Sequence, residues 1–303
     1  MPWSDRFDAL VPAGFPDLEI LPEEPMERHT TFRVGGPARR FVRPASASGC
    51  AALLALAEAE GWPLLILGNG SNLLAADEGI DMLVVHTGKL DGLQRTGERT
   101  IRAGAGVSLA RLPSFAQREG LGGLEFAHGI PGSLGGGVYM NAGAYGGEIK
   151  QVLSAAAAWF PGEGVRQLSR DELALGYRRS IFSEKTGAVL EAEFLLAPDD
   201  PAEIQARMSG FDRRRREKQP LEYPSAGSTF KRPEGYFAGA LIEQCGLKGF
   251  RIGGAQVSEK HAGFVINTGG AACADILALI GHIQETVYDQ TGVRLEPEVK
   301  MVP

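Results

Sequence analysis

The sequence contains few of the residues from which disulfide frameworks and zinc sites are built. Its three cysteines, Cys50, Cys245 and Cys273, are far apart in a chain of 303 residues and form no C-x-x-C pair. They therefore predict neither a disulfide framework nor a cysteine zinc site, and they suit a reducing compartment. The five histidines also lack zinc-ligand spacing, which favours structural roles for them and no bound metal.

Basic surface charge and long apolar runs are missing as well. The net charge of −6 argues against a general nucleic-acid binder, because such a protein needs a basic surface to engage phosphates. No apolar run approaches the roughly 18 residues of a membrane span, and the acidic N-terminus leads into no signal-like core. We expect a cytoplasmic protein that requires no nucleic acid, membrane or obligate protein partner.

The two commonest nucleotide-binding motifs are absent too. Gly104-Ala-Gly-Val-Ser-Leu109 matches only the first half of the dinucleotide fingerprint, since Leu109 stands where a glycine should be. The stretch also follows a predicted hairpin instead of opening a βαβ unit, which excludes a Rossmann site there. No GxxxxGK[ST] sequence supports a P-loop.

What the chain does have is the composition of an ordinary globular protein, with 44% hydrophobic and 22% charged residues. Its length suggests about two domains. We interpret residues 1–27 as a proline-rich arm packed on the body, with Phe7, Leu10 and Phe15 as possible anchors. The main boundary is placed near residue 198, because Asp199-Asp200-Pro201 is a strong helix start.

Periodicity and turn residues predict several elements. The expected helices cover 48–60, 201–218 and 271–291, and a hairpin is expected around Gly97-Glu98. Two short strands are expected around the Gly35-Gly36 turn. A last strand from Val293 to Met301 should place Val293, Leu295, Val299 and Met301 on one face.

The most distinctive feature is a glycine-rich segment, Gly129–Gly147. Eight of its nineteen residues are glycine, and none is charged. Glycine lets backbone N–H groups approach a ligand closely, and successive N–H groups can form an anion site. A tightly packed turn region is the alternative. A second loop, Gly68-Asn-Gly-Ser-Asn72, also follows a predicted strand, so the two loops together could hold a pyrophosphate. The cations at 213–216 and 218 are either a solvated helix face or ligand contacts.

Seven short motifs now form a recognisable pattern, because they occur together and in order: Thr31-Phe-Arg-Val-Gly-Gly-Pro37, Leu67-Gly-Asn-Gly-Ser-Asn72, Gly129-Ile-Pro-Gly132, Met140-Asn-Ala-Gly-Ala-Tyr-Gly146, Tyr177-Arg-Arg-Ser180, Ala226-Gly-Ser-Thr-Phe-Lys231 and Glu296-Pro-Glu-Val299. Over about residues 28 to 302 the chain closely resembles the UDP-N-acetylenolpyruvoylglucosamine reductase (UDP-N-acetylmuramate dehydrogenase) family of bacterial cell-wall precursor synthesis.

The resemblance implies an α+β fold. Residues 28–198 would form an FAD-binding domain of the vanillyl-alcohol-oxidase (PCMH) type, built from two α+β subdomains at about 28–88 and 89–198. Residues 199–303 would form a C-terminal α+β substrate-binding domain. The implied reaction is NADPH-dependent reduction of UDP-N-acetylglucosamine enolpyruvate to UDP-N-acetylmuramate through non-covalent FAD, with hydride passing by way of flavin N5.

Three catalytic positions carry over from the family. Arg178 would stabilise the enolate that hydride addition leaves, Ser228 would supply the proton, and Glu298 would hydrogen-bond the developing charge. The resemblance also implies substrate contacts from Tyr177, Lys218, Lys231 and His261. The implied FAD-binding residues are Gly68, Asn69, Gly70, Ser71, Asn72, Gly129, Ile130, Pro131, Gly132, Gly135, Gly136, Asn141, Ala142, Gly143, Ala144, Tyr145 and Gly146.

Two features set this chain apart within the family pattern. Arg232 stands where related enzymes often have asparagine, which leaves substrate contacts at that position open. The short interval between Arg178 and Ser228 resembles a compact subclass without a tyrosine-bearing lid. Two rival functions stay open. One is an oxidase that tethers FAD to His29 or His128, and the other is a nucleotide-binding protein without catalysis.

Overall fold

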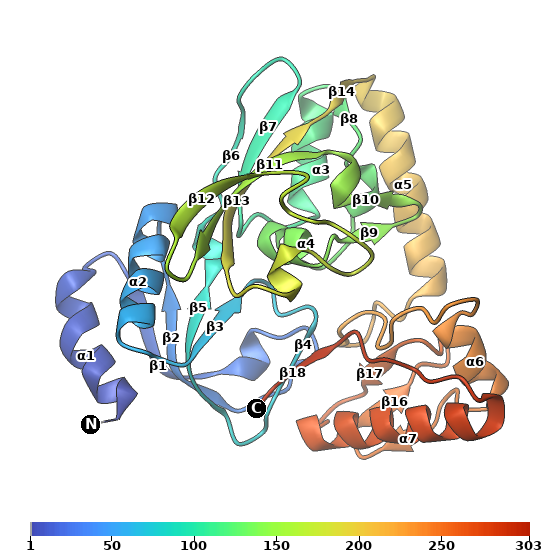
Figure 1. The fold of residues 1–303 in the computed structure, drawn as a ribbon. Helices are drawn as coiled ribbons and strands as arrows, with labels where there is room; N and C mark the ends of the chain where they lie inside the picture. The colour runs from blue at the N-terminus through green and yellow to red at the C-terminus, as the bar shows by residue number, and fades with distance from the viewer. Residues whose placement is uncertain (1) are drawn as a thin grey trace. The chain divides into compact units, whose positions relative to one another are not determined.

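The computed structural model describes residues 2–303, which form two compact units (Figure 1). The first unit comprises the chain up to Pro22 together with Arg39–Asn69 and Asp81–Arg214. The second comprises Glu23–Ala38, Gly70–Ile80 and Arg215–Pro303. The compact units therefore divide the later part of the chain after Arg214 and not near residue 198, and the second unit includes two segments from the N-terminal half. The boundaries of the functional domains stay a prediction.

The first unit begins with a four-stranded sheet of order β1-β2-β5-β3, in which β3 and β5 are parallel. Ser46 Oγ accepts a hydrogen bond from Gly49 N (3.1 Å) and so caps the next helix, as expected for its residue type. Phe7 is fully buried, whereas Leu10 is exposed and is not an anchor. The elements are α1 (Trp3–Gly14), β1 (Glu19–Pro25), β2 (Pro37–Arg43), α2 (Ala47–Ala59), β3 (Leu64–Leu67), β5 (Ile80–His86) and the 3-10 turn η2 (Thr87–Lys89).

The rest of the first unit is built on a five-stranded antiparallel sheet of order β12-β11-β13-β7-β6. The predicted hairpin around Gly97-Glu98 is confirmed, since Arg95 pairs with Ile101. The elements are β6 (Leu93–Arg95), β7 (Thr100–Gly104), α3 (Arg111–Arg118), β8 (Leu121–Gly122), η3 (Glu125–Ala127), α4 (Leu134–Tyr139), β9 (Gly143–Ala144), β10 (Gly147–Glu148), η4 (Ile149–Gln151), β11 (Leu153–Phe160), β12 (Gly164–Ser169), η5 (Ile181–Ser183), β13 (Ala188–Leu195), β14 (Ala197–Pro198) and α5 (Pro201–Lys218).

The second unit has its own core, formed mainly by the long helix α7 against a small antiparallel sheet of order β15-β16-β17. Asp77 accepts hydrogen bonds from the first helical N–H groups of α7, at Cys273 (2.7 Å) and Ala274 (3.1 Å). A carboxylate at a helix N-terminus is stabilising there. The elements are η1 (Met26–Arg28), β4 (Leu73–Ala75), α6 (Ala238–Gln244), β15 (Arg251–Ile252), β16 (Ala255–Val257), β17 (Val265–Asn267), α7 (Cys273–Thr291) and β18 (Lys300–Val302).

The α+β fold class and the three long helices are confirmed, but two predicted strands are wrong. No strand precedes the Gly35-Gly36 turn directly, because residues 29–32 form a turn and residues 33–36 have no regular structure, with a φ of 56° at Arg33. The last strand covers only β18, which pairs in parallel with β4. Met301 is 47% exposed, so the predicted apolar face does not extend to it.

Candidate functional site

The two loops singled out in the sequence meet within the first unit. Asn69 Nδ2 donates a hydrogen bond to Pro131 O at 3.2 Å. A Cβ atom placed on Gly68 would lie only 2.0 Å from Ser133 Oγ, so a side chain there would collide with the glycine-rich segment. The structure thus brings the start of loop 68–72 against residues 131–133, 62 positions later in the chain.

The glycines of the segment 129–147 divide into packing positions and open positions. A Cβ atom on Gly147 would be 2.5 Å from Phe126 Cγ, and one on Gly143 would be 2.6 Å from Gly147 O. By contrast, a Cβ on Gly146, whose φ is 86°, would meet nothing within 4 Å. Gly136 is nearly as open, with Ser133 Oγ at 3.7 Å. The packing interpretation therefore holds for Gly143 and Gly147, and the ligand-binding interpretation stays a prediction for the open positions.

Ser133 is a functional candidate that the sequence reasoning missed. Its side chain is 2% exposed, and its Oγ has no hydrogen-bond partner within residues 2–303. Buried hydroxyl groups are usually paired, so an orphaned one needs an explanation. A hydroxyl donor beside Gly68 and Gly136 suits an anionic ligand group such as a phosphate. The signal was its position inside the glycine-rich segment, between Gly132 and Gly135.

Asn141 is held by protein atoms. It is 1% exposed, and its φ of 44° is unusual outside glycine. Its Nδ2 donates to Glu148 Oε2 (2.9 Å) and to Gly176 O (3.0 Å), while its Oδ1 accepts from Lys150 N (2.9 Å). This geometry assigns the Asn141 side chain to the protein framework. Its predicted contact with a cofactor is left to be tested.

Tyr145 joins the glycine-rich segment to α5. Its ring stacks on Phe211 with centroids 4.8 Å apart and an interplanar angle of 2°, and Arg214 Cζ lies 4.6 Å from its centroid. Residues of α5 up to Arg214 accordingly belong to the first unit. Among the cations of this helix, Arg215 is only 8% exposed, so the cations do not all form a solvated face.

Arg178 lies in a tight turn. Gly176 and Arg179 exchange backbone hydrogen bonds, from Gly176 N to Arg179 O (3.0 Å) and from Arg179 N to Gly176 O (3.2 Å). Arg178 has a φ of 54°, which costs a non-glycine residue free energy of order 1–3 kcal/mol. Strained positions of this kind cluster at functional sites. The Arg178 guanidinium lies 5.1 Å from the ring centroid of Tyr177, which is 57% exposed.

Ser228 and Glu298, which belong to the second unit, come from neighbouring segments. Glu298 N donates to Thr229 O (2.8 Å), and Lys231 N donates to Glu296 O (2.9 Å), so the two motifs run side by side. Thr229 is fully buried, and its Oγ1 accepts from Val265 N (2.9 Å). Ser228, next to it, is exposed. Ser228 is therefore an exposed residue next to a buried, hydrogen-bonded one.

The main chain of Glu298 is held at both of its polar groups. Besides its N–H, its carbonyl oxygen accepts from Asn72 Nδ2 at 3.0 Å. Lys300 N donates in turn to Asn72 O (3.0 Å). Loop 68–72 is therefore shared between the units: Gly68 and Asn69 belong to the first, and the remaining residues, Gly70 to Asn72, to the second.

The predicted substrate contacts of the second unit differ in their surroundings. Lys231 forms an ion pair with Glu296, and Lys218 is exposed. Gly263 N donates to His261 Nδ1 at 3.1 Å, which places the proton of the neutral ring on Nε2. Burial lowers the pKa of His261 below its usual 6.5, so the ring is a neutral hydrogen-bond donor at pH 7.

Arg232 is directed toward an aromatic ring. Its Cζ lies 3.9 Å from the centroid of Phe237, and its Nε donates to Tyr236 O at 3.3 Å. Phe237 is 61% exposed and Tyr236 49% exposed. The residue that replaces the usual asparagine is thus engaged in a cation–π contact.

Within residues 2–303, no helix is both long and apolar enough to cross a membrane.

Comparisons with known proteins cover almost the whole chain. A model of an FAD-binding domain matches residues 38–164, and a model of the UDP-N-acetylenolpyruvoylglucosamine reductase C-terminal domain matches residues 219–302. The curated UDP-N-acetylenolpyruvoylglucosamine reductase of Agathobacter rectalis is 52% identical, and the alignment covers 99% of both chains. That of Pediococcus pentosaceus is 46% identical, over 97% of this chain and 98% of its own.

A solved structure agrees with these relatives. The crystal structure of UDP-N-acetylenolpyruvylglucosamine reductase from Thermus caldophilus is similar with a TM-score of 0.81 at 36% identity. The match covers 94% of this chain and 99% of that one. The chain is therefore a flavin-dependent oxidoreductase with an FAD-binding domain, and it belongs to the UDP-N-acetylenolpyruvoylglucosamine reductase family.

Proposed function

We propose that this chain reduces UDP-N-acetylglucosamine enolpyruvate to UDP-N-acetylmuramate in peptidoglycan precursor synthesis, with NADPH as the electron donor. The observation that carries the proposal is the 52% identity over 99% of both chains with a curated reductase of this family. The presence of Arg178, Ser228 and Glu298 at the three motif positions supports it further.

The residues present fit a bound FAD. The match to an FAD-binding domain spans both glycine loops. Open positions at Gly136 and Gly146 leave room beside the backbone, and the orphaned Ser133 hydroxyl offers a donor for a phosphate. Gly68, Asn69 and the segment 129–146 would hold the cofactor within the first unit. When bound, FAD supplies the hydride, which it receives from NADPH.

Residues of the protein would then stabilise the negative charge and supply the proton. Hydride addition at the vinyl CH₂ carbon converts it to a methyl group and leaves an enolate conjugated with the carboxylate. Arg178, permanently charged and forked, would stabilise that charge. Ser228 would donate a proton to the adjacent carbon, which completes the lactyl ether and leaves a serine alkoxide to be reprotonated from solvent. Glu298, held through its main chain, would hydrogen-bond the developing charge.

Substrate contacts follow from exposure and polarity. Tyr177 and Lys218 are accessible to a ligand. His261 offers a neutral Nε2–H donor, which can bind an anionic or carbonyl oxygen without needing a particular pH near neutrality. Lys231 would have to exchange its ion pair with Glu296 for a ligand, which the modest strength of exposed ion pairs permits.

The decisive experiment separates the two half-reactions by stopped-flow absorbance of the flavin. In Ser228→Ala, NADPH should reduce the flavin at the normal rate, while reoxidation by UDP-N-acetylglucosamine enolpyruvate should slow about 10²- to 10⁴-fold, as expected for loss of a general acid. The matched control is Ser225→Ala, which removes a hydroxyl three positions earlier and should leave both rates within about threefold.

Three results would contradict the proposal. Unchanged reoxidation in Ser228→Ala would remove Ser228 from the proton transfer. Failure of the unaltered protein to oxidise NADPH in the presence of the substrate would reject the reaction itself. Flavin that stays attached to the denatured chain would favour the rival oxidase, with FAD tethered to His29 or His128.

A further inference from the structure

The turn that carries Arg178 is held by the glycine-rich segment. Asn141 Nδ2 donates to Gly176 O (3.0 Å), the first residue of the turn. Just after the turn, Ser180 Oγ donates to Tyr139 O at 2.6 Å. Asn141 and Ser180 are each 1% exposed. Two hydrogen bonds from these buried residues therefore attach the two ends of this turn to residues 139–141.

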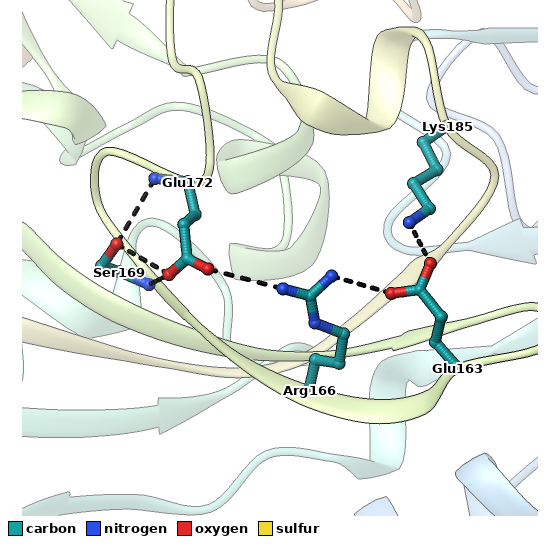
Figure 2. A network of polar contacts seen from close by, with 5 residues as sticks. All are labelled: Glu163, Arg166, Ser169, Glu172 and Lys185. Carbon is teal, nitrogen blue, oxygen red and sulfur yellow. Dashed lines mark hydrogen bonds and ion pairs between the residues drawn. The ribbon is translucent and has the colours of Figure 1, made fainter.

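Glu172 and Lys185, which stand before and after the turn in the sequence, belong to an exposed polar network shown in Figure 2. Arg166 contacts Glu163 (2.7 Å) and Glu172 (3.4 Å), Lys185 pairs with Glu163, and Ser169 Oγ donates to Glu172 Oε2 (2.8 Å). These contacts join β12 to the segment around the turn. Exposed ion pairs contribute little, because solvent screens them. The hydrogen bonds of Asn141 and Ser180 come from side chains that are almost fully buried, so solvent competes with them less.

Asn141 is suited to hold a strained conformation. Its side chain makes three hydrogen bonds to protein atoms: Nδ2 donates to Glu148 Oε2 and to Gly176 O, and Oδ1 accepts from Lys150 N. The positive φ of Arg178 persists only where the surroundings over-determine it. A carbonyl at the start of the turn, fixed by a fully buried amide, is such a constraint.

We propose that Asn141 is a positioning residue: through the Gly176 carbonyl it holds the turn that directs Arg178, and it makes no contact with FAD itself. The proposal rests on the catalytic role of Arg178 proposed above. It reassigns Asn141 from a cofactor contact to a link between the cofactor-binding segment and the residue that stabilises the substrate's charge. The predicted consequence is a defect confined to the half-reaction with the enolpyruvyl substrate.

The test compares Asn141→Ala with Asn267→Ala. Asn267 is a matched control in the second unit, because it is also buried and also makes three hydrogen bonds, from Nδ2 to Phe32 O and to Oδ1 from Gly269 N and Ala271 N. Asn141→Ala should slow flavin reoxidation by substrate about 10²-fold, as a misplacement of about 1 Å can. Its FAD Kd and its rate of reduction by NADPH should stay within about threefold. Asn267→Ala should leave all three quantities within about threefold.

A double-mutant cycle then tests the link to Arg178. If Asn141 acts through Arg178, Asn141→Ala combined with Arg178→Ala should be no slower in reoxidation than Arg178→Ala alone, within about threefold. Should Asn141→Ala fail to fold, Ser180→Ala removes the other buried anchor. The same cycle with Arg178→Ala then applies, again with no further slowing expected.

The outcomes separate this inference from the proposed function. Multiplied defects in the double variant, or a large loss of FAD affinity in Asn141→Ala, would overturn the positioning role. Normal reoxidation in both Asn141→Ala and Ser180→Ala would overturn it as well, with the role of Arg178 intact. Normal reoxidation in Arg178→Ala would instead reject the proposed role of Arg178, and the inference would fall with it.

Discussion

The close approach between Gly68 and Ser133 gives a prediction whose size can be worked out from the structure. A Cβ atom on Gly68 would lie 2.0 Å from Ser133 Oγ and 3.2 Å from Ser133 Cβ. Ordinary contacts begin near 3.4 Å, so Gly68→Ala forces the buried hydroxyl out of its place. Overpacking of this kind costs about 1–3 kcal/mol of the free energy of unfolding.

A second substitution should relieve that cost. Ser133→Ala removes the Oγ atom and leaves only the 3.2 Å contact, which small shifts can accommodate. By itself Ser133→Ala should change stability by less than about 1 kcal/mol, because it deletes a hydroxyl that has no hydrogen-bond partner among residues 2–303. The double variant should therefore recover about 1–2 kcal/mol relative to Gly68→Ala, which is a coupling energy typical of residues in contact.

The assay is urea unfolding, followed by circular dichroism, of four flavin-free proteins: the unaltered chain, Gly68→Ala, Ser133→Ala and the double variant. The four curves are fitted with a common m-value. FAD titration of Ser133→Ala adds a second readout. Loss of a hydrogen bond to a charged phosphate should weaken FAD binding about 10-fold or more. Additive effects in the four-protein cycle would refute the proximity of the two loops. Unchanged FAD affinity would refute only the role of the Ser133 hydroxyl.

Three further predictions concern packing and protonation. Phe7→Ala should cost about 3–5 kcal/mol in urea unfolding, since Phe7 is fully buried against Trp62; a loss below about 1 kcal/mol would contradict its place in the core. Because burial lowers the pKa of His261, the unfolded chain binds more protons below pH 6.5, so stability should fall as pH drops through that value. His261→Gln should flatten this dependence of stability on pH, and an unchanged dependence would contradict the lowered pKa of His261. Burial raises the pKa of Cys50 to about 12, and burial together with nearby carboxylates raises that of Cys273 to about 11. At pH 8 neither thiol should react with a disulfide reagent until urea unfolds the chain, because the thiolate is the reactive form.

Elements with strong local signals could be predicted from the sequence. The helix expected at 271–291 is α7 (Cys273–Thr291), and Gly292 ends it with a φ of 71°. The helix expected from Pro201 is α5. Proline at the first helical position and glycine after the last one act through the backbone alone. Such signals need no knowledge of the rest of the chain.

The N-terminal elements were missed because tertiary packing decides them. Helix α1 contains Pro12, and β1 contains Pro22 and ends at Pro25, so local propensity disfavours both. Phe7 and Val11 nevertheless form part of the main core. β1 lies at the edge of its sheet, where proline is tolerated. The segments that pack against α1 and pair with β1 cannot be identified from residues 1–27 alone.

The site shows the same division between local and distant information. Glycine density indicated the candidate cofactor loops, but it could not say which glycines pack and which stay open, because Phe126 and Ser133 decide that. Asn141 looked like a loop residue beside a ligand, and its partner Gly176 lies 35 positions later. That separation is why its role was not visible in the motif. With Asn141 in the positioning role proposed above, one segment would both bind the flavin and set the position of Arg178. A substitution in this segment would then affect substrate reduction even where FAD binding is normal.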